Sequence, residues 1–223
     1  HTRYIGDWSS DVCSSDLGGC GTGMNPPEAL AGQIDVSRET MDRLAAYVAL
    51  VEKWQQRVNL VSASTLPDIW MRHIWDSAQL APLVPAGTGR ILDVGSGAGF
   101  PGLVLAALCD AELHLVESDQ KKAVFLQTVI RETGIRAIVH NRRIESLPPI
   151  GAGIVTARAL ASLDRLLDFL EAQLVPGTRC LFLKGARAEA ELAALDTRSD
   201  IIHRLHPSLT NPEAFVVDLT VTS

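Results

Sequence analysis

The sequence lacks long apolar runs and patterned cysteines, and each absence excludes a class of protein. No apolar run approaches the roughly eighteen residues needed to cross a bilayer. The N-terminus lacks the basic-then-apolar pattern of a secretory signal peptide. The four cysteines form no C-x-x-C pair and have no spacing typical of zinc ligands. We therefore expect a cytoplasmic protein with reduced thiols, no metal centre and no membrane association.

Net positive charge is also absent. The formal net charge is -6 at pH 7, whereas proteins that bind nucleic acid through overall charge are usually basic. This excludes a general nucleic-acid binder but leaves room for a local basic patch. The length of 223 residues is sufficient for one sizeable core and a small attached subdomain.

Residues 90–102, with the sequence RILDVGSGAGFPG, are the most informative stretch. They begin with a short apolar run, typical of a buried parallel strand. A glycine-rich turn follows, and then the helix-forming residues 103–108. Glycine suits such a turn because its backbone takes positive φ and can approach a ligand without a Cβ in the way. The stretch therefore predicts a strand, a ligand-binding turn and a helix.

Two cofactor chemistries fit this turn. From Gly97 it matches G-x-G-x-x-G, the dinucleotide fingerprint, and Glu117 lies about twenty residues further on, as that fingerprint requires. From Asp93 it matches Asp-x-Gly-x-Gly-x-Gly, the first motif of S-adenosylmethionine-dependent methyltransferases, with Gly95, Gly97 and Gly99 as the glycines. The Asp93 carboxylate favours the second match, because it would repel a pyrophosphate but suits an ammonium group. A glycine turn without any ligand is the third alternative.

From residue 85 onward, strand and helix patterns alternate, which is typical of a doubly wound α/β sheet. We expect strands at residues 91–94, 112–117, 137–140, 153–156, 180–183, 201–205 and 214–221. Seven strands that end in a hairpin favour the Rossmann-like sheet of class I S-adenosylmethionine-dependent methyltransferases over the six-stranded dinucleotide sheet. We therefore assign residues 85–223 to such a domain.

The residues before the sheet divide into two parts. Residues 1–23 have no sustained period and are expected to be a disordered or artefactual extension. Residues 24–84 predict a small helical subdomain, in which Ser37 caps a first helix and Pro67 begins a second. The sequence has no internal repeat and no long low-complexity linker.

Three polar side chains outside the turn are candidate site residues. Glu117 ends the second strand, where its carboxylate can accept hydrogen bonds from both ribose hydroxyls of a cofactor; the alternative is a charge that complements a helix dipole. His73 and Asp76 are three residues apart and would share a helix face. We favour an ordinary side-chain pair for these two, and the alternative is packing against the cofactor crevice.

Several motifs together resemble the RsmG family of small-subunit ribosomal RNA methyltransferases, once called glucose-inhibited division protein B. The resemblance covers nearly everything after residue 36. Its motifs are Asp93–Gly102, Arg143–Glu145, Ala157–Leu163, Leu183–Gly185, Asn59–Leu60 and His73–Ser77. It implies methylation of N7 of one guanine in the decoding-region loop of 16S rRNA, with S-adenosylmethionine as the cofactor and the small ribosomal subunit or its assembly intermediate as the partner. It also implies a monomeric enzyme.

The resemblance also implies roles for individual residues. Gly95 and Phe100 would line the methionine end of the cofactor, and Ile144 and Glu145 would meet its adenine edge. Arg158 would lie beside both the cofactor and the incoming base. Together with Lys184, it is the candidate catalytic residue. One departure is visible, because Gly153 stands where the family usually has aspartate.

The chemistry of guanine N7 makes few demands on the protein. Its free lone pair needs no general base, so catalysis would come from holding N7 in line with the methyl carbon. The Asn/Asp-Pro-Pro-aromatic motif of enzymes that methylate exocyclic amines is absent after the fourth strand. A methyltransferase acting on another RNA base or a small molecule is the alternative. A dinucleotide-dependent oxidoreductase is less favoured, because no Tyr-x-x-x-Lys motif is present.

RNA contacts must come from a local patch on this acidic chain. The candidate cations follow the second to fifth strands and are Lys121, Lys122, Arg142, Arg143, Arg158, Arg165 and Lys184. Such a weakly basic patch predicts that the assembled subunit binds better than naked RNA. For Lys121 and Lys122, the alternative is a solvated helix face.

Overall fold

The computed structural model describes residues 25–28, 33–195 and 199–223. The disorder expected for residues 1–23 concerns a segment outside these described residues. None of the described helices is both long and apolar enough to cross a membrane.

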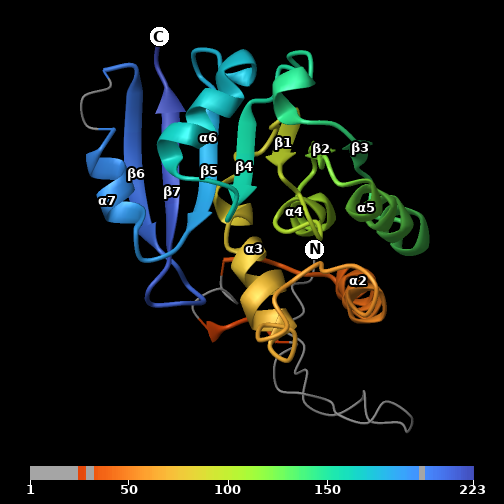
Figure 1. Ribbon diagram of the computed structural model, residues 1–223. Coiled ribbons are helices and arrows are strands. Elements are labelled where there is room, and N and C mark those ends of the chain that lie inside the picture. The colour runs from red at the N-terminus through yellow and green to blue at the C-terminus, as the bar shows by residue number, and fades with distance from the viewer. Residues whose placement is uncertain (1–24, 29–32, 196–198) are drawn as a thin grey trace, which may run out of the picture.

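A single seven-stranded sheet forms the centre of the molecule (Figure 1). Its strands are β1 (Arg90–Val94), β2 (Glu112–Val116), β3 (Ile138–His140), β4 (Ile154–Arg158), β5 (Arg179–Lys184), β6 (Ile201–Pro207) and β7 (Phe215–Val221). The order is β3-β2-β1-β4-β5-β7-β6. The pairs among β1 to β5 are parallel, and β7 pairs antiparallel with both β5 and β6. The expected seven strands and closing hairpin are thus confirmed, with bounds within two residues of those predicted.

Helices cover the sheet on both faces. They are α4 (Gly102–Leu108), α5 (Gln120–Thr133), η3 (Ile144–Ser146), α6 (Leu163–Leu170), η4 (Glu171–Gln173) and α7 (Ala188–Ala193). Alternate residues of β1 face opposite layers, because successive strand side chains point to opposite sides of a sheet. Leu92 and Val94 pack with the α6 and α7 side chains, whereas Ile91 packs with Leu105 of α4. Both faces are buried, which explains the continuous apolar run in the sequence.

The fourth strand is anchored where the sequence departs from the resembling family. The Gly153 N–H donates to the Arg90 carbonyl at 3.1 Å, and the Arg179 N–H donates to the Gly153 carbonyl at 3.0 Å. These bonds tie the residue just before β4 to the beginnings of β1 and β5. A backbone ladder therefore fixes this strand without a side chain at position 153.

The segment before the sheet is helical. Its elements are α2 (Arg38–Gln55), the π-helix η1 (Trp70–Trp75), α3 (Asp76–Ala78) and the 3-10 helix η2 (Ala81–Leu83). Ser37 caps α2 by accepting from the Thr40 N–H, as predicted. The second helical piece, predicted to start near Pro67, begins slightly later, because Pro67 lies in a turn, Ile69 is helical and η1 starts at Trp70.

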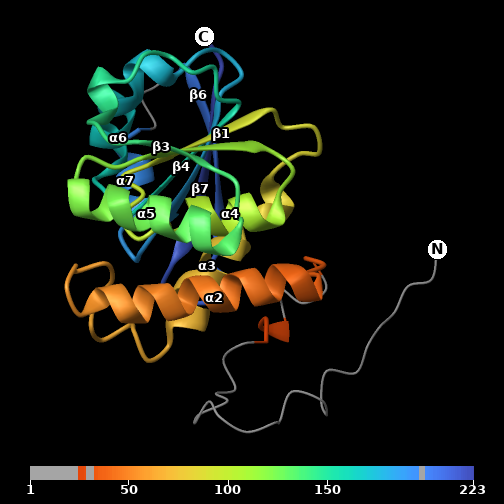
Figure 2. The same ribbon diagram turned by 90° about the vertical axis from the view of Figure 1, so that its right-hand side faces the viewer.

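Helix α2 packs along α4 and α5, as Figure 2 shows. Tyr47 of α2 stacks on Phe100 at 5.2 Å between ring centroids, and Trp54 meets Phe125 of α5 edge-on at 5.6 Å. Among the described residues, the apolar side chains of α2 and η1 belong to the same buried cluster as those of α4 and α5. The helical segment thereby reaches the glycine turn. The division at residues 84 and 85 stays a prediction.

Candidate active site

The strand order reverses between the parallel strands β1 and β4: β2 and β3 follow on one side of this pair, and β5 on the other. In open α/β sheets, ligands bind at such a reversal point. After β1 the chain enters the glycine turn, in which Gly95, Gly97 and Gly99 have φ values of +66°, +56° and +94°. Side chains rarely adopt such values, so the turn needs these glycines. After β4 the chain turns at Ala159, a non-glycine residue with φ of +50°. Both turns lie at the carboxyl edge of the sheet.

A first cavity of about 350 Å³ opens at this edge. It brings together six of the predicted cofactor residues: Gly95, Gly97, Glu117, Ile144, Glu145 and Arg158. The other lining residues include Lys122, Arg142, Arg143, Leu160 and Phe169. A Cβ at Gly95 would lie 2.7 Å from the Leu160 side chain. The Leu160 side chain therefore packs directly against Gly95, and any larger residue there would collide with it.

The Glu117 carboxylate is held by backbone donors at the edge of this cavity. Its Oε2 accepts from the Gly97 N–H at 2.8 Å, and its Oε1 accepts from the Asp119 N–H at 2.7 Å. Asp119 in turn caps α5, which leaves the dipole role to that residue. Each carboxylate oxygen has a further lone pair, so Glu117 can support the turn and still accept from a ligand hydroxyl.

Three predicted cofactor residues lie outside the lining of the first cavity. Asp93 is fully buried below the turn, Gly99 approaches Leu103 and the Tyr47 hydroxyl, and Phe100 is 6% exposed. The Phe100 ring stacks on both Tyr47 and His73. These three residues support the turn from beneath, because the apolar contacts of α4 and α2 draw them into the core.

The Asp93 carboxylate is a buried anion. Its Oδ1 accepts from the Thr156 hydroxyl at 2.8 Å, whereas its Oδ2 has no hydrogen-bond partner among the described residues. Burial raises the pKa of Asp93 from its ordinary 3.8 to about 6. A raised pKa means that the folded state binds this proton more tightly than the unfolded state does. The protein therefore loses stability as the pH rises from about 3.8 to about 6, and the full cost of the buried carboxylate is present above that range.

We expect Asp93→Asn to stabilise the protein in a pH-dependent manner. The amide keeps an oxygen for Thr156 but carries no charge, so unfolding at pH 8 should cost about 2 kcal/mol more than in the wild type. Near pH 4.5 the carboxyl of the folded wild type is still protonated and only part of this cost has developed, so the difference between the two proteins should be clearly smaller. Urea unfolding at both pH values measures this. The same difference at both pH values would contradict a buried, titrating carboxylate.

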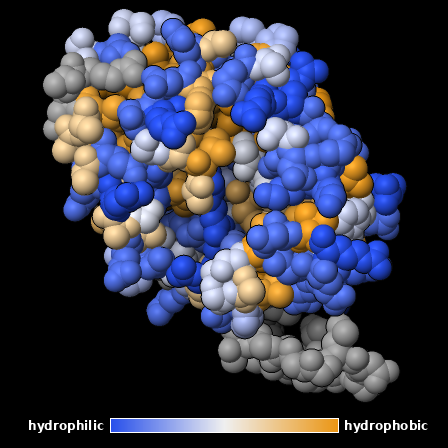
Figure 3. Space-filling view, viewed as in Figure 1, coloured by the Kyte–Doolittle hydropathy of each residue, from blue (hydrophilic) through white to orange (hydrophobic). Residues whose placement is uncertain are grey.

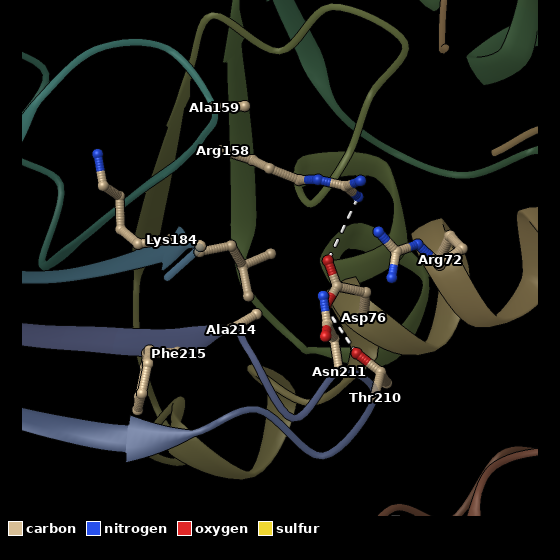
Figure 4. Close-up of a pocket in the computed structure, with 11 residues that line it drawn as sticks. Arg72, Asp76, Arg158, Ala159, Lys184, Thr210, Asn211, Ala214 and Phe215 are labelled. Atoms are coloured by element: carbon tan, nitrogen blue, oxygen red, sulfur yellow. Dashed lines mark hydrogen bonds and ion pairs between the residues drawn. The ribbon is translucent and has the colours of Figure 1, made fainter. Parts of the chain in front are cut away.

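A second, smaller cavity of about 160 Å³ adjoins the first (Figure 4). Arg158 and Ala159 line both cavities. The remaining lining residues come from the helical segment, from β5 and from the β6–β7 hairpin: Arg72, Asp76, Leu183, Lys184, Gly185, Thr210, Asn211, Ala214 and Phe215. Figure 3 shows the same side of the molecule as Figure 1. This face is mostly hydrophilic and is hollowed between the end of β4 and α3. The end of β4 thus separates two adjoining spaces.

Arg158 is held at this boundary by the helical segment. Its Nη2 lies 2.9 Å from Nδ1 of His73, and its Nη1 lies 3.5 Å from Oδ2 of Asp76. The prediction that His73 and Asp76 pair with each other is wrong, because each meets Arg158 instead. Asp76 lines the second cavity, whereas the buried His73 lines neither cavity, so the alternative of packing against the cofactor crevice stays a prediction. Nη1 is buried and has no hydrogen-bond partner among the described residues, although it lies within ion-pair distance of Asp76.

Lys184 lies on the wall of the second cavity, but its ammonium is engaged elsewhere. Its Nζ donates to the Ala161 carbonyl at 2.7 Å and pairs with Glu191 of α7 at 2.7 Å. Figure 4 shows the side chain extending away from Arg158. Lys184 therefore anchors the chain that follows Ala159.

Most of the predicted cations line the two adjoining cavities, and Lys121 and Arg165 do not. Lys122, Arg142 and Arg143 line the first cavity, whereas the Arg165 guanidinium lies over the Phe169 ring at 5.6 Å and lines neither cavity. Sequence reasoning missed Arg72, Thr210 and Asn211. The chain between Arg72 and Thr210 includes the whole parallel part of the sheet, so no local spacing could have joined them.

Comparisons with known proteins identify close relatives. A family model described as rRNA small subunit methyltransferase G matches residues 40–211. The Ribosomal RNA small subunit methyltransferase G of Paramagnetospirillum magneticum is 51% identical over 197 residues, which cover 88% of this chain and 96% of that protein. The protein of the same name in Rhodospirillum rubrum is 46% identical over 191 residues, which cover 86% of this chain and 95% of that protein.

Solved structures show the same fold at much lower identity. A crystal structure of a SAM dependent methyltransferase from Aquifex aeolicus matches with a TM-score of 0.58 and 14% identity, over 78% of this chain and 98% of that chain. The mitomycin 7-O-methyltransferase MmcR matches with a TM-score of 0.56 and 14% identity, over 83% of this chain and 69% of that chain. Because these identities are low, the two structures bear on the fold alone. The predicted Rossmann-like class I methyltransferase architecture is confirmed.

Proposed function

The chain belongs to the rRNA small subunit methyltransferase G family, and on this premise we propose that it transfers the methyl group of S-adenosylmethionine to N7 of a guanine in the decoding-region loop of 16S rRNA. One observation carries the proposal. Arg158 and Ala159 line both cavities, so a methyl donor in the first and a base in the second would meet at the end of β4.

The first cavity fits S-adenosylmethionine. Its volume of about 350 Å³ lies within the range of small-molecule sites, and the glycine turn lines it through Gly95 and Gly97. Glu117 would hold the ribose hydroxyls, and Ile144 and Glu145 would hold the adenine. When bound, the cofactor supplies an electrophilic methyl group on a sulfonium centre. Asp93 and Phe100 would act from beneath, by keeping the glycine turn in shape.

The second cavity would hold the target base. Guanine N7 carries a free lone pair, so the protein has to orient the base rather than remove a proton. Arg158 is suited to this task, because its charged side chain lines both cavities. Lys184 would contribute indirectly, by fixing the carbonyl of Ala161. β4 runs into Ala159, Leu160 and Ala161, with no Asn-Pro-Pro motif for an exocyclic amine.

RNA phosphates would contact the cations at the mouths of the two cavities. Lys122, Arg142 and Arg143 line the first mouth, and Arg72 lines the second. The net charge of -6 limits non-specific attraction to RNA. We therefore propose that a monomer acts in the cytoplasm on the small subunit or an assembly intermediate, where the folded RNA presents the decoding-region loop.

The experiment is methyl transfer from labelled S-adenosylmethionine to two substrates, namely small subunits and deproteinised 16S rRNA, both from cells that lack the enzyme. We expect one 7-methylguanine in the decoding-region loop, located by mass mapping, and a kcat/KM at least about tenfold higher on the subunits. Methylation at another atom would overturn the proposed reaction. Equal rates on both substrates, with steep salt dependence, would overturn the proposed partner.

A further inference from the structure

The π-helix η1 places an imidazole against the guanidinium that separates the two cavities. Residues Trp70–Trp75 form a π-helix, a conformation that occurs frequently at functional sites. From it His73, which is 5% exposed, reaches Arg158 of β4, which is 85 residues further along the chain. The His73 ring is held on two further sides, by a stacking contact with Phe100 at 4.9 Å and by Thr65 Oγ1 at 2.8 Å from Nε2.

We propose that His73 is a positioning residue for methyl transfer: its bare Nδ1 accepts a hydrogen bond from Arg158 and thereby holds the guanidinium between the cofactor and the base. This inference rests on the proposed function and deepens it, because it gives the helical segment a part in the reaction.

The hydrogen bonds around the ring fix its tautomer. The Thr65 hydroxyl donates to the Ser62 carbonyl at 2.9 Å, so the single hydroxyl proton is already used. Thr65 must then accept from His73, which places the ring proton on Nε2. Nδ1 is left with its lone pair and can only accept, and the N–H group opposite it belongs to Arg158.

The ring's charge state agrees with this assignment. Burial, followed by the positive charges of Arg158 and Arg72, lowers the pKa of His73 to about 3. The imidazole is therefore neutral at physiological pH. A protonated ring would present an N–H to the guanidinium and repel it, so neutrality is a condition for the contact.

Asp76 does not replace this contact. Its Oδ2 lies 3.5 Å from Nη1 of Arg158, which is too long for a good hydrogen bond. Its Oδ1 is occupied, because it accepts from Gln79 at 2.9 Å and from Thr210 at 2.7 Å. Asp76 thus supplies charge, whereas His73 supplies the short directional bond that sets the orientation of the guanidinium.

Two substitutions of His73 separate positioning from structural support. His73→Asn can place its amide oxygen where Nδ1 lies, whereas His73→Gln places its amide near Nε2 and so keeps a group for Thr65 but none for Arg158. Both variants lose the stacking contact with Phe100, so their stability losses should be similar. His203→Gln, on the exposed surface of β6, is the matched control.

We expect His73→Gln to lower kcat about 30-fold, with the KM for S-adenosylmethionine changed less than threefold. His73→Asn should recover kcat to within about threefold of the wild type. In an Arg158→Lys background the His73→Gln effect should shrink to less than about threefold, because the interaction that it removes is already altered. Equal kcat values for the two His73 variants, or additive effects in the double variant, would overturn the proposal.

A second measurement does not depend on activity. In ¹⁵N spectra of the free enzyme, His73 should be neutral with its proton on Nε2 at pH 6, and the Nδ1 signal should change in Arg158→Lys. A ring protonated on Nδ1 would overturn the inference. If the wild type methylates no small subunits, the proposed function fails, but these spectra still decide whether His73 holds Arg158.

Discussion

Replacing Arg158 by alanine is expected to lower kcat for methyl transfer by at least about 100-fold. Arg158 and Ala159 line both cavities, and of these two residues only Arg158 has a charged side chain that could orient a base. A small misplacement of reacting atoms is sufficient for a loss of this size. Single-turnover assays on small subunits, with saturating S-adenosylmethionine, measure the chemical step directly.

The variant also leaves His73 and Asp76 without their shared partner, so stability must be measured alongside activity. An unpaired buried acceptor costs about 1–3 kcal/mol, and a folded variant should therefore melt at a lower temperature but still bind S-adenosylhomocysteine. Arg165→Ala is the matched control, because this exposed arginine lies over Phe169 and lines neither cavity. Activity of Arg158→Ala within twofold of the wild type would remove Arg158 from the mechanism.

The parts of the site that the sequence predicted are those that depend on short stretches of chain. The strand, glycine turn and helix at residues 90–108 follow from apolar runs and from positive φ, which are properties of neighbouring residues. The position of Glu117 beside the turn follows from parallel pairing of β1 with β2. Arg158 at the end of β4 follows from the same rule, since parallel strands end at the same edge of the sheet.

The parts that it did not predict depend on packing between distant segments. Phe100 was expected at the cofactor, but the aromatic rings of Tyr47 and His73 bury it on the other side of the turn. The spacing of His73 and Asp76 suggested that the two side chains pair with each other. Instead, both contact the Arg158 guanidinium, which lies 85 residues after His73 in the sequence. No local pattern could have indicated these contacts.

These contacts also explain why the helical segment accompanies the sheet. The sheet supplies the glycine turn, Glu117 and Arg158, but it does not fix the direction of the Arg158 side chain. Helix α2 presses Tyr47 onto the turn, and η1 brings His73 and Asp76 to the guanidinium. The same segment contributes Arg72 to the second cavity. The substrate side of the site is therefore formed by both parts of the chain.

Gly102→Ala should destabilise the protein by about 2–3 kcal/mol. Gly102 begins α4 directly against β1 and β2. A Cβ there would lie 2.4 Å from the Leu115 side chain and 2.6 Å from Oδ2 of Asp93. Leu115 and Asp93 are fully buried, so neither can move aside without disturbing the core. Thermal and urea unfolding should both report the loss.

Gly153→Ala is the matched control for Gly102→Ala. A Cβ at Gly153 meets nothing within 4 Å, and its φ lies outside the positive range, so we expect a change of less than about 0.5 kcal/mol. Because α4 carries the end of the glycine turn, a shift of its first residue should also weaken S-adenosylhomocysteine binding, which Gly153→Ala should leave unchanged. Equal free energies of unfolding for the two variants would contradict this prediction. They would mean that α4 can move away from the sheet, and that the close approach at Gly102 does not set the shape of the turn.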